Sequence, residues 1–287
     1  MRLSSLHTHT KFCDGADDVE TLCRSAYEKG LSALGFSSHA PVGKKTGLVS
    51  DWNMKDDAVE AYLDEVRAAK CRWAGRLPVY LGMEVDFISG LTGPADRDYR
   101  DMGLDYLIGA VHYLVPPRGA PFTVDGPAEE FERGIREGFM GDSERLAQAY
   151  FDAEEAMIRA GGFDILAHPD LIKKNNAGER WFSLESAPFI RRFEGIASLC
   201  AAQALVVEVN TGGLNRKRTR ELYPGPRFLH RFQAAQVPVL ITADAHRAAD
   251  LDGNYGTALS ALRDAGYTET VLFEGKSGAS RWKRAPL

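Results

Sequence analysis

The sequence predicts an α/β protein whose parallel strands close into a barrel. Short apolar segments alternate with longer helical patterns along the whole chain, which is typical of βα units and a parallel sheet. Several of the short segments are almost continuously apolar, as expected for strands buried on both faces. The chain has 287 residues and shows no internal repeat, low-complexity tract or linker, so we expect one domain over residues 1–287. This length favours a closed barrel over an open sheet.

Each predicted element follows from its local pattern. Eight apolar segments are expected to form strands: 2–6, 33–37, 79–85, 106–111, 164–167, 205–209, 237–241 and 271–273. Six segments with helical periodicity lie between them: 17–29, 54–73, 142–160, 185–203, 227–235 and 257–265. The first of these begins with Asp17 as a candidate N-cap, has Glu20 three residues later, and ends at Gly30. The basic residues near the end of the chain are expected to form a solvated tail: Lys276, Arg281, Lys283 and Arg284.

The connections between these elements are uneven in length. Long segments that contain glycine, proline and aspartate follow many of the predicted strands, namely 39–56, 86–101, 112–129, 168–185 and 210–225. The segments that lead into strands are short. In an α/β barrel the loops after the strands form the face that carries the chemistry. We therefore expect the functional site at the C-terminal mouth of the barrel.

Composition and charge exclude several classes of protein. The chain is 44% hydrophobic and 26% charged, with a formal net charge of −5, as in ordinary globular proteins. No apolar run approaches the roughly 20 residues that span a bilayer, and no apolar signal core follows the N-terminal methionine. The four cysteines have no paired spacing, which indicates reduced thiols. We expect a cytoplasmic protein without membrane or nucleic-acid partners, and the sequence leaves its oligomeric state open.

Six of the seven histidines lie at or just after the C-terminal end of a predicted strand. They are His7, His9, His39, His112, His168 and His246, whereas His230 lies on a helical segment and is expected to be structural or at the surface. The carboxylates of Asp14, Glu84 and Asp244 stand in similar positions. His7 and His9 are two residues apart on an extended segment, so both imidazoles point to one side.

These nine side chains together predict a metal centre. One histidine at a strand end is more often a partly buried structural residue, but a barrel gathers its strand ends into one small mouth. Burying this many imidazoles and carboxylates together would be costly unless metal ions neutralised them. Nine ligands are too many for one tetrahedral ion and suit a cluster of two or three. Imidazole and carboxylate ligands accept Zn, Mn or Fe, so the sequence does not identify the metal.

The same residues resemble the motifs of the polymerase and histidinol phosphatase (PHP) superfamily. The resemblance rests on His7-Thr-His9 with Asp14-Gly15, on His39, Glu84, His112 and His168-Pro-Asp170, and on Asp244-Ala-His246. Longer stretches are similar to its histidinol-phosphatase branch: 6–15, 35–40, 50–54, 109–112, 168–174 and 208–213. The similarity runs from residue 3 to about residue 250 and keeps the order of all motifs.

The resemblance implies a distorted (β/α)7 barrel with a trinuclear metal centre at its C-terminal mouth. The first metal would take His7, His9, Glu84 and Asp244. Glu84 would bridge to a second metal completed by His112 and His168, and the third would take Asp14, His39 and His246. Because eight strands are predicted and the family has seven, segment 271–273 should lie outside the closed barrel or pair at its edge.

A centre of this kind suits the hydrolysis of a phosphate monoester. Water held between the metals becomes the nucleophile, and the ions neutralise the phosphoryl oxygens. The candidate catalytic residues are Glu84, as the bridge, and Asp244 and His246; either of these two, or a metal-bound water, could protonate the leaving group. The resemblance implies L-histidinol phosphate as the substrate, and nucleotides or other small phosphate esters are the alternative.

Two other functions of a protein with such a centre are disfavoured. The acidic net charge argues against a proofreading exonuclease. The complete ligand set argues against a degenerate scaffold without turnover.

The phosphate of the substrate also requires cations at the mouth. Arg216 ranks first and Lys173 second, because both follow predicted strands and an arginine can hold two phosphate oxygens. We expect Arg216 to contact the phosphate and not the metals or the fold. Other cations on strand-end loops are Lys44, Lys45, Lys174, Lys217 and Arg218. Trp52 and Phe87 are candidates for the pocket wall, although burial in the core fits each of them equally well.

Overall fold

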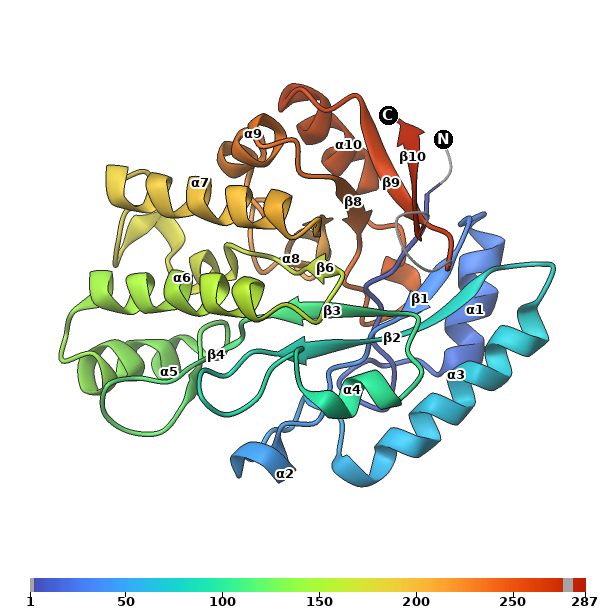
Figure 1. Ribbon diagram of the computed structural model, residues 1–287, viewed down its shortest axis with the longest axis horizontal. Helices are drawn as coiled ribbons and strands as arrows, with labels where there is room; N and C mark the ends of the chain where they lie inside the picture. Colours follow the sequence, from blue (N-terminus) through green and yellow to red (C-terminus); the bar gives the residue numbers. More distant parts are fainter. Residues whose placement is uncertain (1–2, 276–280) are drawn as a thin grey trace.

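A curled parallel sheet forms the centre of the computed structural model, which describes residues 3–275 and 281–287 (Figure 1). The sheet has six strands in the order β1-β2-β3-β6-β7-β8. They are β1 (Leu34–Phe36), β2 (Val79–Asp86), β3 (Tyr106–Ala110), β6 (Ile165–Leu166), β7 (Val206–Asn210) and β8 (Val239–Thr242). All neighbouring pairs are parallel, with Glu84 opposite Ile108 between β2 and β3.

The N-terminal segment closes this sheet between β1 and β8. Ser5 forms a parallel bridge with Leu34, and Thr8 forms one with Ala245. The N–H of Gly35 donates to the carbonyl of Ser5 (2.7 Å), and the N–H of His9 donates to the carbonyl of Ala245 (2.8 Å). The segment therefore takes the seventh strand position in an irregular form, and the predicted distorted (β/α)7 barrel is confirmed. Its pairing falls on residues 5–9 instead of the expected 2–6, and residue 2 lies outside the described residues.

Six long helices cover the outside of the barrel and confirm the six predicted helical segments. They are α1 (Val19–Glu28), α3 (Val59–Trp73), α6 (Ser143–Ala160), α7 (Ala187–Ala202), α9 (Pro226–Ala234) and α10 (Tyr255–Asp264). The N-cap of α1 is Asp18, whose carboxylate accepts a hydrogen bond from the N–H of Thr21. The predicted cap, Asp17, instead accepts a hydrogen bond from the N–H of Ala248. Among the described residues, no helix has the length and apolarity to cross a membrane.

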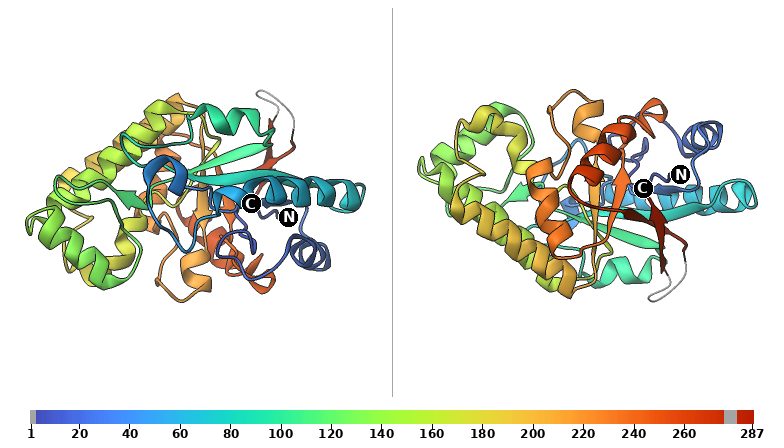
Figure 2. Two further views of the ribbon diagram at one scale, coloured as in Figure 1. Left: turned by 90° about the horizontal axis from the view of Figure 1, so that it is seen from below. Right: turned by 90° about the horizontal axis from the view of Figure 1, so that it is seen from above.

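The long loops after the strands contain short elements that were not predicted. The α-helices are α2 (Gly43–Thr46), α4 (Arg97–Asp101), α5 (Ala128–Arg133) and α8 (Gly212–Asn215). The 3-10 helices are η1 (Asp56–Ala58), η3 (Leu171–Asn175), η4 (Ala177–Glu179) and η5 (Ala248–Asp250), and η2 (Gly134–Gly138) is a π-helix. Strands β4 (Tyr113–Leu114) and β5 (Phe122–Thr123) form an antiparallel hairpin. Figure 2 shows α5, α6 and α7, in green to yellow, as a lobe on one side of the barrel.

One part of the barrel interior is a cluster of buried apolar side chains. Its residues are Leu6, Tyr106, Ile108, Ala110, Ile165, Ala167, Val206, Leu240, Val271 and Phe273. The hydroxyl of Tyr106 lies 2.5 Å from the carbonyl oxygen of Leu6. A Cβ atom at Gly35 or Gly82 would lie 2.4 or 2.6 Å from atoms of the Tyr106 ring and hydroxyl. Glycine at both positions therefore makes room for this side chain inside the barrel.

The C-terminal segment forms a hairpin against this apolar interior. β9 (Glu269–Phe273) pairs antiparallel with β10 (Trp282–Pro286) in a separate two-stranded sheet, so the expectation that 271–273 lies outside the barrel is confirmed. The expected solvated tail is wrong, because the backbone of β10 bonds to β9 and the ring of Trp282 packs 5.1 Å from that of Phe273. Arg281 also pairs with Asp164 (2.6 Å), and Lys276 lies outside the described residues.

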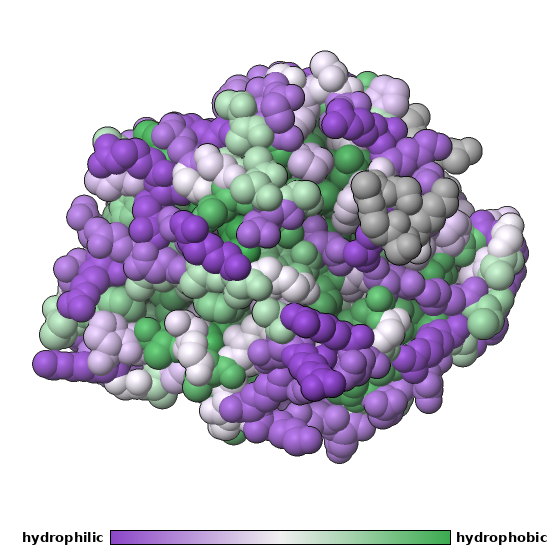
Figure 3. Space-filling model, viewed as in Figure 1, coloured by the Kyte–Doolittle hydropathy of each residue, from purple (hydrophilic) through white to green (hydrophobic). Residues whose placement is uncertain are grey.

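The outer surface is mainly polar. Figure 3 shows hydrophilic side chains over most of the face seen in Figure 1, with apolar residues in smaller areas between them. The large hydrophobic residues that are exposed are scattered along the chain: Tyr27, Val49, Leu91, Val115 and Met140. His230 is exposed on α9, in agreement with its predicted position outside the site.

Candidate metal centre

All nine predicted ligands meet at the C-terminal mouth of the barrel. The N-terminal segment and its following turn carry His7, His9 and Asp14, His39 follows β1, and Glu84 lies on β2. His112 follows β3, His168 follows β6, and Asp244 and His246 follow β8. The parallel strands place these residues together because all their C-terminal ends point to the same side.

Glu84 lies at the middle of this group and is 1% exposed. Five imidazoles surround its two oxygens: Oε2 lies 3.1 Å from His7 Nε2, 3.5 Å from His9 Nε2 and 3.0 Å from His39 Nδ1, and Oε1 lies 3.0 Å from His168 Nε2 and 3.7 Å from His112 Nε2. Burial by itself raises the pKa of this carboxyl, but His7, His39 and His112 outweigh burial and hold the pKa well below its usual range. Glu84 is therefore an ionised carboxylate with both oxygens directed at imidazoles.

Asp14 and Asp244 complete the group on the side of His9. Asp244 Oδ1 lies 3.2 Å from His9 Nε2, and Asp14 Oδ2 lies 3.0 Å from His246 Nε2. Burial raises the pKa of each carboxyl, but neighbouring cations and imidazoles outweigh it and lower both pKa values. Burial, together with His246 and His39, lowers the pKa of His9 to about 3, so this imidazole is neutral as a metal ligand must be.

The buried atoms of this group fit a cluster of metal ions. His7 Nε2, His9 Nε2, His39 Nδ1 and Glu84 Oε2 are buried and have no hydrogen-bond partner among the described residues. Buried polar atoms are almost always partnered, so four such atoms that face one another fit ligands of a metal ion. Their nitrogen and oxygen donors suit Zn, Mn or Fe.

The ligand atoms fall into groups that match the expected metal sites. Within each group the ligand atoms lie within 4.8 Å of one another, and three of the groups are Glu84 with His112 and His168, His7 with His9 and Glu84, and His9 with Asp14, His39 and His246. The first reproduces the set expected for the second metal, and the last contains the set expected for the third. Asp244 lies beside the remaining group, 3.7 Å from His7 Nε2.

Sequence reasoning missed two buried carboxylates behind the ligands. Glu208 on β7 accepts hydrogen bonds from His7 Nδ1, the N–H of His168, Asn210 Nδ2 and the hydroxyl of Thr242, at 2.8, 2.9, 2.8 and 2.8 Å. Asp86 accepts a hydrogen bond from His112 Nδ1 at 2.7 Å. Carboxylates in this position fix the orientation and tautomer of ligating imidazoles. A role for Asp86 could have been predicted from the sequence, because Asp86 lies two residues after Glu84 and so on the same face of the strand.

A cavity of about 630 Å³ opens above the ligands. Besides the ligands, its wall includes Trp52, Thr123, Asp125, Lys174, Arg216 and Arg218. The ring of Trp52 meets that of His39 edge-on with centroids 4.5 Å apart, so Trp52 lines the cavity as the sequence suggested. Phe87 does not line the cavity and packs against the hydrophobic core.

Arg216 reaches this cavity but also contacts the candidate ligands. Nη2 donates to Asp244 Oδ2 (2.9 Å), and Nη1 lies 2.6 Å from the carbonyl oxygen of Asp244 and 2.8 Å from His246 Nδ1. The expectation that Arg216 contacts the phosphate alone is therefore corrected, because its guanidinium also neutralises Asp244. Three of its five N–H groups are engaged in these contacts, and the N–H of Nε and one N–H of Nη2 remain available.

Lys173, the second predicted phosphate ligand, is not placed in the cavity. Its ammonium donates to Asp170 Oδ2 (2.7 Å) and to the carbonyl of Leu222 (2.5 Å), and it lines an adjoining cavity. Asp170 is fully buried, so its carboxylate requires a nearby cation. The neighbouring Lys174 lines the metal cavity instead and pairs with Asp125 (3.0 Å).

Comparison with known families matches residues 5–212 to the PHP domain. The chain belongs to the PHP domain family. A Deinococcus radiodurans PHP relative, named "Probable histidinol-phosphatase", is 31% identical over 272 residues, which cover 94% of this chain and 96% of the relative. The histidinol-phosphatase of Bacillus subtilis is 24% identical over 265 residues, which cover 87% of this chain and 95% of the relative.

Solved structures show the same fold. A Listeria monocytogenes protein assigned as a histidinol phosphatase superposes with a TM-score of 0.77 at 24% identity, over 88% of this chain and 99% of the other. The histidinol phosphate phosphatase of Lactococcus lactis, solved with Zn, L-histidinol and phosphate, has a TM-score of 0.64 at 16% identity, over 96% and 97% of the two chains. The PHP barrel of this protein is thus shared nearly end to end with these structures.

Proposed function

We propose that the protein is a metal-dependent phosphomonoesterase that hydrolyses L-histidinol phosphate to L-histidinol and phosphate in histidine biosynthesis. The observation that carries this proposal is the complete set of nine converging ligands beneath a cavity that also presents Arg216. The names of the two relatives, one of them 31% identical over nearly the whole chain, support the same activity and substrate.

Two to three divalent ions of Zn, Mn or Fe would occupy the centre. His7, His9, Glu84 and Asp244 would hold the first, Glu84 with His112 and His168 the second, and Asp14 with His39 and His246 the third. When bound, the ions supply an activated water and neutralise the phosphoryl oxygens. The unpaired buried atoms of His7, His9, His39 and Glu84 support this assignment.

The chain itself positions the substrate around these ions. Arg216 lines the cavity, and its two N–H groups that make no contact with Asp244 or His246 could hold two phosphate oxygens. Among the described residues, the only lining carboxylate outside the ligand set is Asp125; its Oδ2 pairs with Lys174, and its Oδ1 could accept a hydrogen bond from the ammonium group of histidinol. The pKa of Asp244 lies well below its usual range, so this carboxylate carries no proton at neutral pH and is not the group that protonates the leaving oxygen.

A phosphate-release assay on metal-loaded protein tests the proposal. L-histidinol phosphate, AMP and p-nitrophenyl phosphate are compared at matched concentrations, with protein treated with a chelator as the control. We expect the highest kcat/KM for L-histidinol phosphate and no release after chelation. An equal or higher kcat/KM for AMP would overturn the substrate assignment, and an absence of release from all three would overturn the phosphatase assignment.

A further inference from the structure

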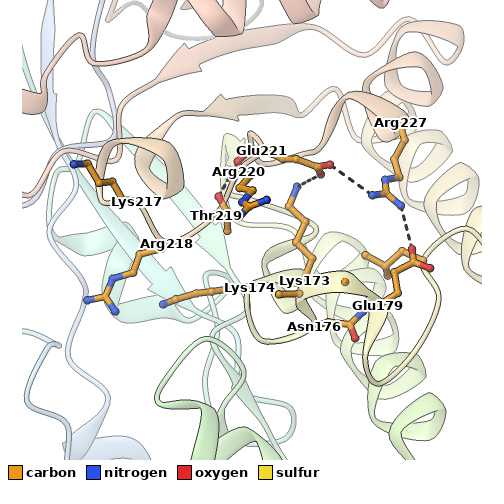
Figure 4. A pocket seen from close by; sticks show the side chains of 13 residues that line it. Lys173, Lys174, Asn176, Glu179, Lys217, Arg218, Thr219, Arg220, Glu221 and Arg227 are labelled. Atoms are coloured by element: carbon orange, nitrogen blue, oxygen red, sulfur yellow. Dashed lines mark hydrogen bonds and ion pairs between the residues drawn. The ribbon is translucent and has the colours of Figure 1, made fainter.

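A second cavity of about 720 Å³ adjoins the metal cavity (Figure 4). Six cationic side chains line it against only two carboxylates, Glu179 and Glu221. The cations are Lys173, Lys174, Lys217, Arg218, Arg220 and Arg227. This concentration of positive charge stands out in a chain whose formal net charge is −5. We call this space the basic cavity.

Three of these six cations have no partner among the described residues. Lys173 pairs with Asp170, Lys174 with Asp125, and Arg227 with Glu179. The side chains of the other three make no hydrogen bond or ion pair within the part of the chain that the structure describes: Lys217, Arg218 and Arg220. Like charges gathered without counter-charges repel one another, and an anion between them removes that repulsion.

The basic cavity communicates with the metal cavity. Lys174 and Arg218 line both spaces. In Figure 4 these two side chains lie at the end of the basic cavity opposite the Arg227–Glu179 ion pair. Lys174 and Arg218 are therefore accessible to a phosphate dianion from either cavity.

The positive charge of the basic cavity disfavours the cationic part of the proposed substrate. The leaving group, histidinol, carries an amine, whose ammonium form the unpaired cations Lys217, Arg218 and Arg220 repel. An oxyanion is favoured instead, because the planar guanidinium groups of Arg218 and Arg220 match two oxygens of a tetrahedral anion.

We propose that the basic cavity is a second anion site, which binds phosphate next to the metal centre. This proposal depends on the proposed function only for the source of the phosphate, because the cations and the cavity are present whichever ester the enzyme hydrolyses. Its occupant is an inorganic phosphate or the phosphate group of a small molecule.

Equilibrium dialysis of the metal-loaded protein with radiolabelled inorganic phosphate at low ionic strength tests the proposal. We expect two phosphates per chain in the wild type. The double variant Lys217→Ala with Arg220→Ala weakens one of the two sites by about tenfold or more, because two charge-assisted contacts are lost. Arg216→Ala weakens the other site. L-histidinol, which has no phosphate, displaces nothing from the basic cavity, whereas L-histidinol phosphate competes if phosphate esters also bind there.

The matched control removes the same charge elsewhere. Arg97 and Arg136 are 90% and 68% exposed and line neither cavity, so Arg97→Ala with Arg136→Ala should keep both phosphate sites. Saturation at one phosphate per chain, survival of both sites in the Lys217 and Arg220 double variant, or equal weakening in the control would overturn the proposal. If the protein releases no phosphate from any ester but still loses a phosphate site in that double variant, the proposed function fails and the second anion site stands.

Discussion

Replacing Glu208 by Gln tests how far the metal centre depends on a residue that contacts no metal in the proposed scheme. Glu208 is fully buried on β7, and each of its oxygens accepts two hydrogen bonds. Oε1 accepts from the N–H of His168 (2.9 Å) and from Asn210, and Oε2 accepts from His7 Nδ1 (2.8 Å) and from Thr242. Glutamine has nearly the same shape but replaces one of these acceptors by an NH2 group.

Either orientation of the new amide disturbs a ligand. If the NH2 group faces His7, the Nδ1 of His7 loses its acceptor and the tautomer that presents Nε2 to a metal is no longer fixed. If it faces His168, a buried backbone N–H stays unpaired, which costs about 1–3 kcal/mol. Loss of such a supporting carboxylate typically weakens metal binding by about 10–100-fold, or roughly 1.4–2.7 kcal/mol.

The assay is metal content after dialysis against a graded series of chelator concentrations, together with kcat/KM. Glu154→Gln is the matched control, because Glu154 is also fully buried but its pKa is raised well above the usual range by burial, so its carboxyl is already neutral. We expect Glu208→Gln to lose metal at a chelator concentration at least tenfold lower than the wild type or Glu154→Gln. Wild-type metal retention and a kcat/KM within about twofold of wild type in Glu208→Gln would refute the reasoning.

Three further predictions follow from the site and its surroundings. Arg216→Ala should lower kcat/KM by about 10²-fold and also reduce metal content, because Asp244 and His246 lose the hydrogen bonds that hold them in place; Arg216→Lys should restore only part of both, and unchanged kinetics in Arg216→Ala would contradict the assignment. Glu84→Gln should bind fewer metal ions than His246→Ala, as measured by elemental analysis, because Glu84 faces two groups of ligands; equal metal content would argue against a bridge. Glu154 keeps its proton in the folded protein, whereas the unfolded chain releases it above the usual pKa of 4.5, so the free energy of unfolding should fall by up to about 1.4 kcal/mol for each pH unit above that value. Urea unfolding between pH ~5.5 and ~7.5 should show a smaller fall in Glu154→Gln than in the wild type. An equal fall in the two proteins would refute the neutral carboxyl.

The metal ligands were predictable because each carries a local signal. A histidine or carboxylate directly after an apolar strand can be read from a few neighbouring residues, and the barrel then brings such positions together without further information. The division into metal groups came from the family resemblance and stays a prediction; the groups of neighbouring ligand atoms overlap with it, but one of them joins His39 and His112 with Asp86.

Positions that depend on distant partners were not predictable in the same way. Lys173 and Lys174 are adjacent in sequence, and only the buried Asp170 and the 3-10 turn of η3 decide that Lys174 faces the metal cavity. Glu208 lies inside a strand, where its role depends on three donors from other segments, His7, His168 and Thr242, and on Asn210 of the same strand. The C-terminal strand β10 has a polar sequence, and its pairing depends on β9 and on the packing of Trp282.

The irregular segment that closes the barrel makes the candidate metal centre depend on residues that are synthesised far apart in time. Thr8 pairs with Ala245, which is synthesised 237 residues after it. Because closing so long a loop is entropically costly, we expect His7 and His9 to reach Asp244 late in folding. A chain that ends before Asp244 has most of the histidines but lacks the complete candidate ligand set, so we expect tight metal binding only once the barrel has closed.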